Sequence, residues 1–363
     1  MSIATCEQHP LLRYLRDPVC GETLGSTDWE RLIRAARQGY LLSRVAWLAK
    51  NHGFIERLPE KIAFHLESAL RVAQSQAVSV NWEVAQIQKA LAESAIPFVL
   101  LKGAAYIKGQ FECAHGRLLS DVDIMVPKER LLEAEKALCS HGWFPTKIKA
   151  YDQRYYREWM HELPPLQHLD RGTTLDVHHT ILPPTALLKP DVNKLWSAVC
   201  AVENVKNAFV LSPVDMVLHS ATHLFHDSEL EHGVRDLVDI DALLQQFSGQ
   251  DRFFEALLDR AFELDLCRPL YYALKYCRAF LRTSIPDDIV ARCAKQDSQS
   301  ILVRAIMDVV VLESIGSILA ERSTIKSQVS QFAMYLRAHY LKMPLHQLLP
   351  HLLRKQFASE SDG

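Results

Sequence analysis

The sequence lacks the features that define fibrous, low-complexity and membrane-spanning chains. Its 363 residues contain 13 glycines and 16 prolines, too few for a collagen-like or low-complexity chain. The most apolar long stretch, residues 301–320, is interrupted by Arg304, Asp308 and Glu313, which makes a membrane span unfavourable. The net charge of −2 lacks the basic excess of proteins that coat nucleic acids. A membrane or nucleic-acid partner is therefore not expected.

Cysteine is present but not in a metal-binding pattern. The eight cysteines are spread along the chain, and none forms a CxxC pair, so a cysteine-rich zinc site is not expected. The N-terminal segment MSIATCEQHPLLRYLRDP has arginine and aspartate where a signal peptide requires an apolar core. We therefore expect a cytoplasmic protein with free thiols, whose length allows two or three domains.

Apolar periodicity divides the chain into three predicted domains. Apolar residues at helical spacing predict helices over most of residues 1–95, including a long helix after Pro59. Short apolar and alternating runs predict an α/β core over 96–211. From Ser212, which can cap a helix, helical patterns return and continue over 212–363. The expected fold class is α+β, mainly helical, with N-terminal helices and a C-terminal helical bundle on either side of the α/β core.

Within the central segment, the order of predicted elements is strand, helix, strand, helix, strand. A turn-rich stretch separates the second helix from the last strand. The strands are expected at 98–101, 120–126 and 173–181, and the helices at 104–111 and after Pro127. In the C-terminal segment, helices after the first are expected near 234–247, 251–264, 268–282, 286–295, 299–321 and 326–355.

Two aspartates in the strand SDVDIMV give the strongest chemical signal. Asp121 and Asp123 are two residues apart, so in a strand their carboxylates point to the same face. Converging carboxylates repel each other unless a cation lies between them, and Mg²⁺ prefers oxygen ligands of this kind. A third carboxylate, Asp176, lies on a later predicted strand. Three carboxylates could hold two Mg²⁺ ions for phosphoryl transfer, whereas a surface strand that simply exposes two aspartates is the alternative.

The segment upstream of this pair favours phosphate binding. Lys102 and Gly103 lie where a predicted strand passes into a helix, and glycine allows a phosphate to approach the backbone. Lys102 adds a positive charge, and Arg117 could clamp a phosphate with its planar guanidinium. Ser120 directly precedes the aspartate pair. The order of these residues within one α/β unit is more informative than any of them alone.

The stretch LLKGAAYIKGQF, followed by GRLLSDVDIMV, resembles the signature of the nucleotidyltransferase superfamily of DNA polymerase beta type. It is most similar to a bacterial branch of uncharacterised nucleotidyltransferases, and the helical segments on both sides also resemble that branch. The resemblance implies that Gly103 is the phosphate-loop glycine and that Asp121, Asp123 and Asp176 are the metal-binding catalytic acids. The wider superfamily commonly has serine or glycine after this glycine, whereas this chain has Ala104. Lys102 or backbone amides would therefore replace the serine hydroxyl.

Histidines form a second group of candidates. His219, His223 and His226 share a face of a predicted helix, followed by His232 and the pair Arg235–Asp236. A separate metal site or a histidine–aspartate phosphohydrolase site is one interpretation, but the order of residues does not match such a site. The alternative is that this helical face borders the nucleotide site, where His223 and Arg235 could contact substrate. His178 shares a face with Asp176 and could orient a metal ligand or a substrate hydroxyl.

Together these features predict a Mg²⁺-dependent nucleotidyltransferase that uses an NTP such as ATP as co-substrate. Asp121, Asp123 and Asp176 are the expected catalytic and metal-binding residues of this enzyme. The near-neutral charge favours a small molecule, peptide or protein as the acceptor. A nucleotide-binding or scaffolding protein that has lost catalysis is the main alternative. The sequence leaves open the acceptor, the preferred base and the oligomeric state. The expected nucleotide-binding residues are Lys102, Gly103, Arg117 and Ser120.

Overall fold

The computed structural model of the protein has a seven-stranded mixed sheet at its centre. The structure describes residues 6, 8–146, 149–227, 230, 232–296, 299–320, 324–344, 346 and 348. The strand order is β3-β4-β5-β2-β1-β7-β6. The strands are β1 (Phe98–Leu100), β2 (Val122–Met125), β3 (Trp143–Pro145), β4 (Leu166–His168), β5 (Thr174–His178), β6 (Cys200–Ala201) and β7 (Ala208–Val210).

The central strands β5, β2 and β1 set the geometry of the sheet. β2 and β5 are parallel, and their register places Asp123 directly opposite Asp176. β1 runs antiparallel to β2 and parallel to β7. All residues of β1 and β2 are buried, as expected for strands that are covered on both faces. The two facing aspartates therefore lie in the interior part of the sheet and not at an edge.

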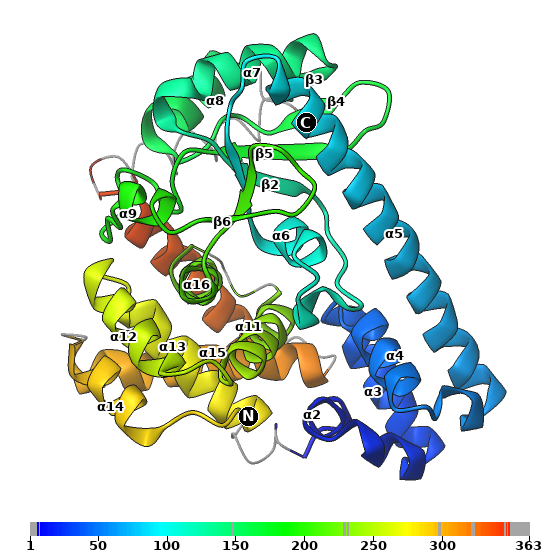
Figure 1. The fold of residues 1–363 in the computed structure, drawn as a ribbon. Coiled ribbons are helices and arrows are strands. Elements are labelled where there is room, and N and C mark those ends of the chain that lie inside the picture. The colour runs from blue at the N-terminus through cyan, green and yellow to red at the C-terminus, as the bar shows by residue number, and fades with distance from the viewer. Residues whose placement is uncertain are drawn as a thin grey trace.

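Helices surround this sheet on several sides (Figure 1). The long helix α5 runs along one side of the molecule, from the N-terminal helices α3 and α4 to the strands (Figure 1). The N-terminal helices are α2 (Pro10–Arg16), α3 (Ser26–Gln38), α4 (Leu42–Asn51) and α5 (Glu60–Ala92). The helices of the sheet-bearing segment are α6 (Lys102–Lys108), α7 (Leu131–Ser140), α8 (Ala150–Arg154) and α9 (Val192–Trp196).

The C-terminal segment is helical wherever it is described as regular structure. Its helices are α10 (Pro213–Thr222), α11 (Gly233–Phe247), α12 (Phe253–Glu263), α13 (Cys267–Tyr276), α14 (Asp287–Gln296), α15 (Ile301–Ala320) and α16 (Ile325–Lys342). Two π-helical turns, His223–Asp227 and Cys277–Leu281, continue α10 and α13. Within the described ranges, every helix is too short or too polar to span a lipid bilayer.

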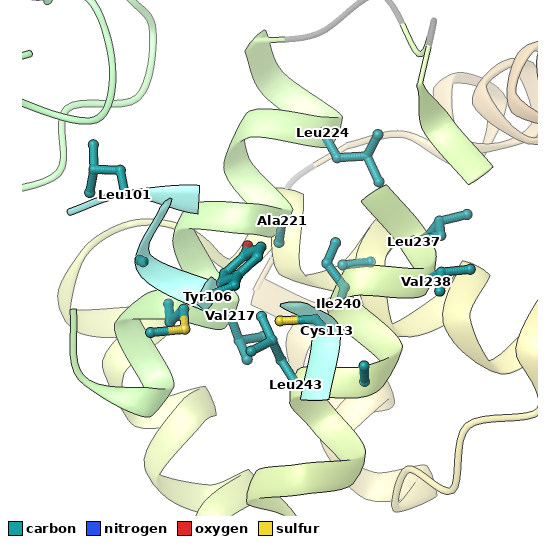
Figure 2. Packing of buried hydrophobic residues seen from close by; sticks show 14 of the residues in the cluster. Leu101, Tyr106, Cys113, Val217, Ala221, Leu224, Leu237, Val238, Ile240 and Leu243 are labelled. Atoms are coloured by element: carbon teal, nitrogen blue, oxygen red, sulfur yellow. The ribbon is translucent and has the colours of Figure 1, made fainter. Parts of the chain in front are cut away.

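One hydrophobic cluster connects the sheet-bearing segment with the C-terminal helices. Figure 2 shows Tyr106 of α6, Val217 of α10 and Ile240 of α11 among the buried side chains of this cluster. The Tyr106 hydroxyl lies 2.6 Å from Ser220 Oγ, so its polar end is also satisfied by the helical segment. Buried side chains of α6, α10 and α11 therefore pack together where the sheet-bearing segment meets the C-terminal helices.

The predicted fold class is confirmed, with differences at particular elements. Ser212 caps α10 as predicted, and its hydroxyl accepts a hydrogen bond from the Asp215 amide. The helix predicted at 104–111 begins at Lys102 and ends at Lys108, because Gly109 closes it. The final predicted helix, 326–355, ends at Lys342 in the described part, and many of its later positions lie outside the described residues. The strands β3, β4, β6 and β7 were not predicted. The division into domains at 95 and 211 stays a prediction.

A buried ion pair joins α10 to α12 and α9. Arg260 Nε donates to Asp215 Oδ1 at 2.7 Å, and Arg260 Nη2 donates to Asp215 Oδ2 at 3.0 Å. The Asp215 side chain is fully buried, with 0% exposure. Arg260 Nη2 also donates to the Lys194 carbonyl at 2.7 Å. One side chain therefore neutralises a buried carboxylate at the start of α10 and fixes the end of α9.

Replacing Arg260 is expected to destabilise the fold. Arg260→Met keeps the aliphatic stem but leaves the Asp215 carboxylate buried without its partner, at a cost of about 3 kcal/mol in the free energy of unfolding. Urea denaturation checks the value. Arg292→Met is the matched control, because Arg292 pairs with Asp288 on the surface and its loss should cost less than about 1 kcal/mol. Equal, small losses in both variants would contradict the importance of the buried pair.

Candidate active site

Asp123 is the most constrained carboxylate in the sheet. Its Oδ1 atom accepts from Lys102 Nζ at 3.0 Å and lies 3.0 Å from His178 Nε2. The residue is buried, with 5% exposure. Burial alone would raise the pKa of Asp123, but Lys102 and His178 outweigh it and hold the pKa well below its usual range. Asp123 is therefore a fixed carboxylate anion in the interior of the protein.

Asp121 and Asp176 differ from Asp123 because their pKa values are raised. Burial and the neighbouring Asp123 charge raise the pKa of Asp121. Burial raises the pKa of Asp176 to about 7, with further contributions from Asp123 and Glu162. The Asp176 Oδ1 atom is buried and makes no hydrogen bond within the described residues. The three aspartates therefore form a crowded anionic cluster that a bound cation would relieve.

Lys102 is held in an unusual backbone conformation beside this cluster. It opens α6 with a φ of +45°, in the left-handed region that is rarely used by residues other than glycine. Its ammonium group is directed to Asp123, and the side chain as a whole is about one quarter exposed. The interpretation of Lys102 as a phosphate ligand stays a prediction, since in this structure the lysine neutralises a carboxylate.

Gly103 has a packing role that the sequence did not suggest. A Cβ atom at this position would lie 2.6 Å from two side-chain carbons of Leu119, closer than real Cβ atoms come to their neighbours. The backbone of Leu119 is itself held by Gln76, whose Oε1 accepts from the Leu119 amide at 2.8 Å. Glycine is therefore required at this position so that the segment leading to Ser120 and Asp121 can pack against α6.

This contact predicts the effect of adding one methyl group. Gly103→Ala should force Leu119 away from α6 and displace the nearby Asp121. We expect a cost of about 1–2 kcal/mol in unfolding free energy, and a loss of transfer activity because Asp121 is moved. Thermal unfolding and transfer assays measure the two effects. The double variant Gly103→Ala/Leu119→Ala restores space and should recover part of the activity. Full activity in Gly103→Ala alone would show that this packing is not needed.

A pocket of about 250 Å³ opens beside the aspartates, between the sheet and the C-terminal helices. Asp121 and Asp123 form one side of it, and His223, Arg235 and Asp239 come from the helical segment. Asp176 and His178 do not line this pocket; they lie next to Asp123 on β5. The predicted site residues that the structure brings to the pocket wall are Lys102, Gly103, Arg117, Ser120, Asp121, Asp123, His223 and Arg235.

Arg117 lies on the pocket wall but is already paired. Its Nε donates to Asp239 Oδ2 at 2.6 Å, and its Nη2 lies 3.8 Å from Asp236 Oδ1. Burial raises the pKa of Asp239 to about 6, against the opposing effect of Arg117. The expected pair Arg235–Asp236 is present, with Arg235 Nε 2.9 Å from Asp236 Oδ1. The pocket wall therefore carries a four-residue ionic network that links the β2 side to α11.

Among the described residues, the predicted histidine face, with His219 on α10 and His223 and His226 on the π-helical turn after it, is not arranged as a metal site. His219 and His226 are buried, whereas the His223 side chain is 30% exposed and lines the pocket. Burial lowers the pKa of His219 well below its usual value, and Lys102 and His223 add to the effect. The π-helical turn that begins at His223 changes the register on which the shared face was predicted. In the ranges that the structure describes, these histidines do not converge as a ligand group.

A different group does converge, and the sequence pattern did not predict it. His161, Glu162 and His178 place one ligand atom each within 4.8 Å of the others. Two of these residues come from the stretch that was predicted as turn-rich, and only its pairing with β5 brings them to the site. The adjacent His-Glu pair in the sequence MHEL was the one local signal for this group.

Comparison with known proteins identifies the family of this chain. A family model described as "Uncharacterised nucleotidyltransferase" matches residues 25–282. The chain belongs to this family. The predicted family is thereby confirmed, and the match covers the whole sheet, the pocket and the aspartates described above. No curated protein and no solved structure matches the chain. Membership of this nucleotidyltransferase family supports nucleotidyl transfer in its general sense.

Proposed function

We propose that the protein is a Mg²⁺-dependent nucleotidyltransferase that moves a nucleoside monophosphate group from an NTP to an acceptor hydroxyl. The acceptor is a small molecule, a peptide or a protein, because the chain has a net charge of −2 and no basic excess for a polynucleotide. The observation that carries the proposal is that Asp123 faces Asp176 across β2 and β5, while Asp121 and Asp123 line the pocket. Membership of the nucleotidyltransferase family supports the same reaction class.

The donor set fits Mg²⁺. Asp123 faces Asp176 on the parallel strands β2 and β5, Asp121 directly precedes β2, and the buried Asp176 Oδ1 has no hydrogen-bond partner among the described residues. Mg²⁺ is held through carboxylate oxygens and substrate phosphates, so these carboxylates are suitable ligands for it. Bound there, the ions would offset the negative charge of the triphosphate oxygens, including the charge that develops on them during transfer. Asp121, Asp123 and Asp176 are the residues that would hold them.

Other side chains would orient Asp123, contact the triphosphate and remove the proton of the acceptor. Lys102 and His178 fix the orientation of Asp123 through hydrogen bonds to one oxygen. The pocket wall supplies Arg117 and Arg235 near the place where a triphosphate would lie. In the transfer, the acceptor oxygen bonds to the α-phosphorus, the bond to the β-phosphate oxygen breaks, and pyrophosphate leaves. Asp176 would take the proton from the acceptor hydroxyl.

A nucleotide-binding protein without transfer is the second candidate. The observation in its favour is that Lys102 Nζ lies 3.0 Å from Asp123 Oδ1, so a lysine neutralises a carboxylate that would otherwise bind metal. The pairing of Arg117 also favours this second candidate, because its guanidinium already donates a hydrogen bond to Asp239. Both candidates predict NTP binding, and transfer of label distinguishes them.

The decisive assay uses α-labelled NTPs with Mg²⁺ and a panel of hydroxyl-bearing small molecules, peptides and proteins. The proposed function predicts label on an acceptor with the wild type and none with the double variant Asp121→Ala/Asp123→Ala. Label that transfers equally with both proteins would contradict the role of the aspartates. NTP binding without transfer to any member of the panel would favour the second candidate.

A further inference from the structure

Backbone hydrogen bonds hold a short segment against the end of β5. Glu162 forms a bridge with His178, the Leu163 amide donates to the Val177 carbonyl at 2.9 Å, and the His179 amide donates to the His161 carbonyl at 2.8 Å. The position of this segment is therefore set by the sheet. It brings His161 and Glu162 to the same place as the His178 side chain.

The three side chains place ligand atoms close to one another. One ligand atom from each lies within 4.8 Å of the other two. His161 and His178 are buried, at 6% and 4% exposure, and the Glu162 side chain is 18% exposed. The imidazole rings are stacked, with centroids 5.1 Å apart. Two imidazoles and one carboxylate favour a borderline metal such as Zn²⁺ over Mg²⁺, which prefers oxygen ligands alone.

The hydrogen bonding of His178 gives a second, independent observation. Its Nε2 atom lies 3.0 Å from Asp123 Oδ1, which favours a proton on Nε2 and a lone pair on Nδ1. The Nδ1 atom is buried and makes no hydrogen bond within the described residues, although Glu162 Oε2 lies 3.3 Å away. Histidines that bind a metal through one nitrogen commonly donate the other N–H to a carboxylate in this way.

A doubly protonated His178 between Asp123 and Glu162 is the competing explanation of the same contacts. It would account for the two carboxylates, and both of them raise the pKa of His178 against the effect of burial. A metal ion would in addition use His161, whose ring stacks on that of His178 and supplies a further ligand atom within the cluster. A metal ion accounts for all three residues.

We propose that His161, Glu162 and His178 bind one Zn²⁺-class metal ion, with a fourth position left for water. The ion would fix the Met160–Leu163 segment on β5 and would hold the His178 ring that orients Asp123. This site uses none of the three aspartates as a ligand. The proposal does not rest on nucleotidyl transfer, because metal binding can be measured without NTP or acceptor.

Cobalt(II) is the probe, because tetrahedral Co²⁺ absorbs visible light strongly and reports the geometry of its site. Full-length protein is treated with a chelator, dialysed and titrated with Co²⁺ in the absence of nucleotide. We expect one equivalent to bind with a tetrahedral spectrum, and Zn²⁺ to displace it. His161→Gln and Glu162→Gln should each weaken Co²⁺ binding at least about tenfold. The metal should also raise the unfolding temperature of the wild type more than that of either variant.

Two control variants locate the ion. His115→Gln removes a histidine that stacks on Trp47, outside the cluster, and should leave Co²⁺ binding unchanged. Asp121→Asn removes a carboxylate of the proposed Mg²⁺ site and should also retain the Co²⁺ spectrum. The proposal is overturned if no stoichiometric Co²⁺ binding occurs. It is equally overturned if Asp121→Asn loses the bound ion while His161→Gln and Glu162→Gln keep it.

Discussion

Asp123→Asn is expected to lower nucleotidyl transfer on the order of 10³-fold, equivalent to about 4 kcal/mol of transition-state stabilisation. The substitution preserves size and an acceptor oxygen for Lys102 and His178 but removes the negative charge. A neutral amide is a poor ligand for Mg²⁺ in comparison with a carboxylate. The fold should survive, because the hydrogen-bond acceptor is retained. Transfer of α-label at saturating NTP measures the loss.

Asp191→Asn is the matched control for this variant. Asp191 caps α9 by accepting a hydrogen bond from the Asn193 amide, and asparagine caps helices about as well as aspartate. It removes one carboxylate that lies outside the pocket wall, so its activity should equal that of the wild type. If Asp123→Asn transfers label within a few-fold of the wild-type rate, Asp123 does not hold the catalytic metal.

Asp176→Asn is expected to make the metal-free protein more stable while it abolishes transfer. Burial raises the pKa of Asp176 to about 7, above the ordinary value near 4, so the folded state disfavours the carboxylate anion. Above pH 7 the wild type must keep this anion buried beside Asp123 and Glu162. Replacement by a neutral amide removes that cost, and we expect a gain on the order of 2–3 kcal/mol in unfolding free energy at pH 8.

The stability difference between Asp176→Asn and the wild type should depend on pH. A carboxyl whose pKa is raised on folding binds more protons in the folded state, so wild-type stability falls as pH rises from about 4 to about 7. The advantage of Asp176→Asn should therefore be complete above pH 7 and should disappear towards pH 4. Mg²⁺ should stabilise the wild type but not the variant. Urea denaturation at several pH values, with and without Mg²⁺, tests both statements. A variant that is less stable than the wild type at pH 8 would contradict this account of Asp176.

Local patterns carried much of the fold prediction. Alternation in SDVDIMV predicted the strand that holds Asp123, although β2 begins at Val122 and Asp121 directly precedes it. The Ser-Pro start of α10 follows from capping and the fixed φ of proline. These signals lie within a few residues of one another. The strands β6 and β7 were missed because they are two and three residues long and have no distinctive pattern. β7 takes its place beside β1 through pairing between residues about 110 apart in the sequence, and β6 then pairs with β7.

The site was less predictable because its contacts are long-range. Lys102 and Arg117 line the pocket together with Asp121 and Asp123, but the partners of these two cations could not be predicted from nearby residues. Arg117 pairs with Asp239, 122 residues later, and Lys102 pairs with Asp123. Glu162 was not predicted, because a turn-rich stretch gives no register with a later strand. The charge state of the cluster follows from burial and these pairings together, which sequence spacing does not reveal.

The central claim is that the three aspartates hold metal and NTP together beside the pocket. Calorimetric titration of the protein with a non-hydrolysable NTP, in the presence and absence of Mg²⁺, tests it without knowledge of the acceptor. The account predicts that nucleotide binds with Mg²⁺ and at least about tenfold more weakly without it, and that Asp121→Ala/Asp123→Ala abolishes the difference. Nucleotide affinity that is independent of Mg²⁺, or that is unchanged in the double variant, would contradict it.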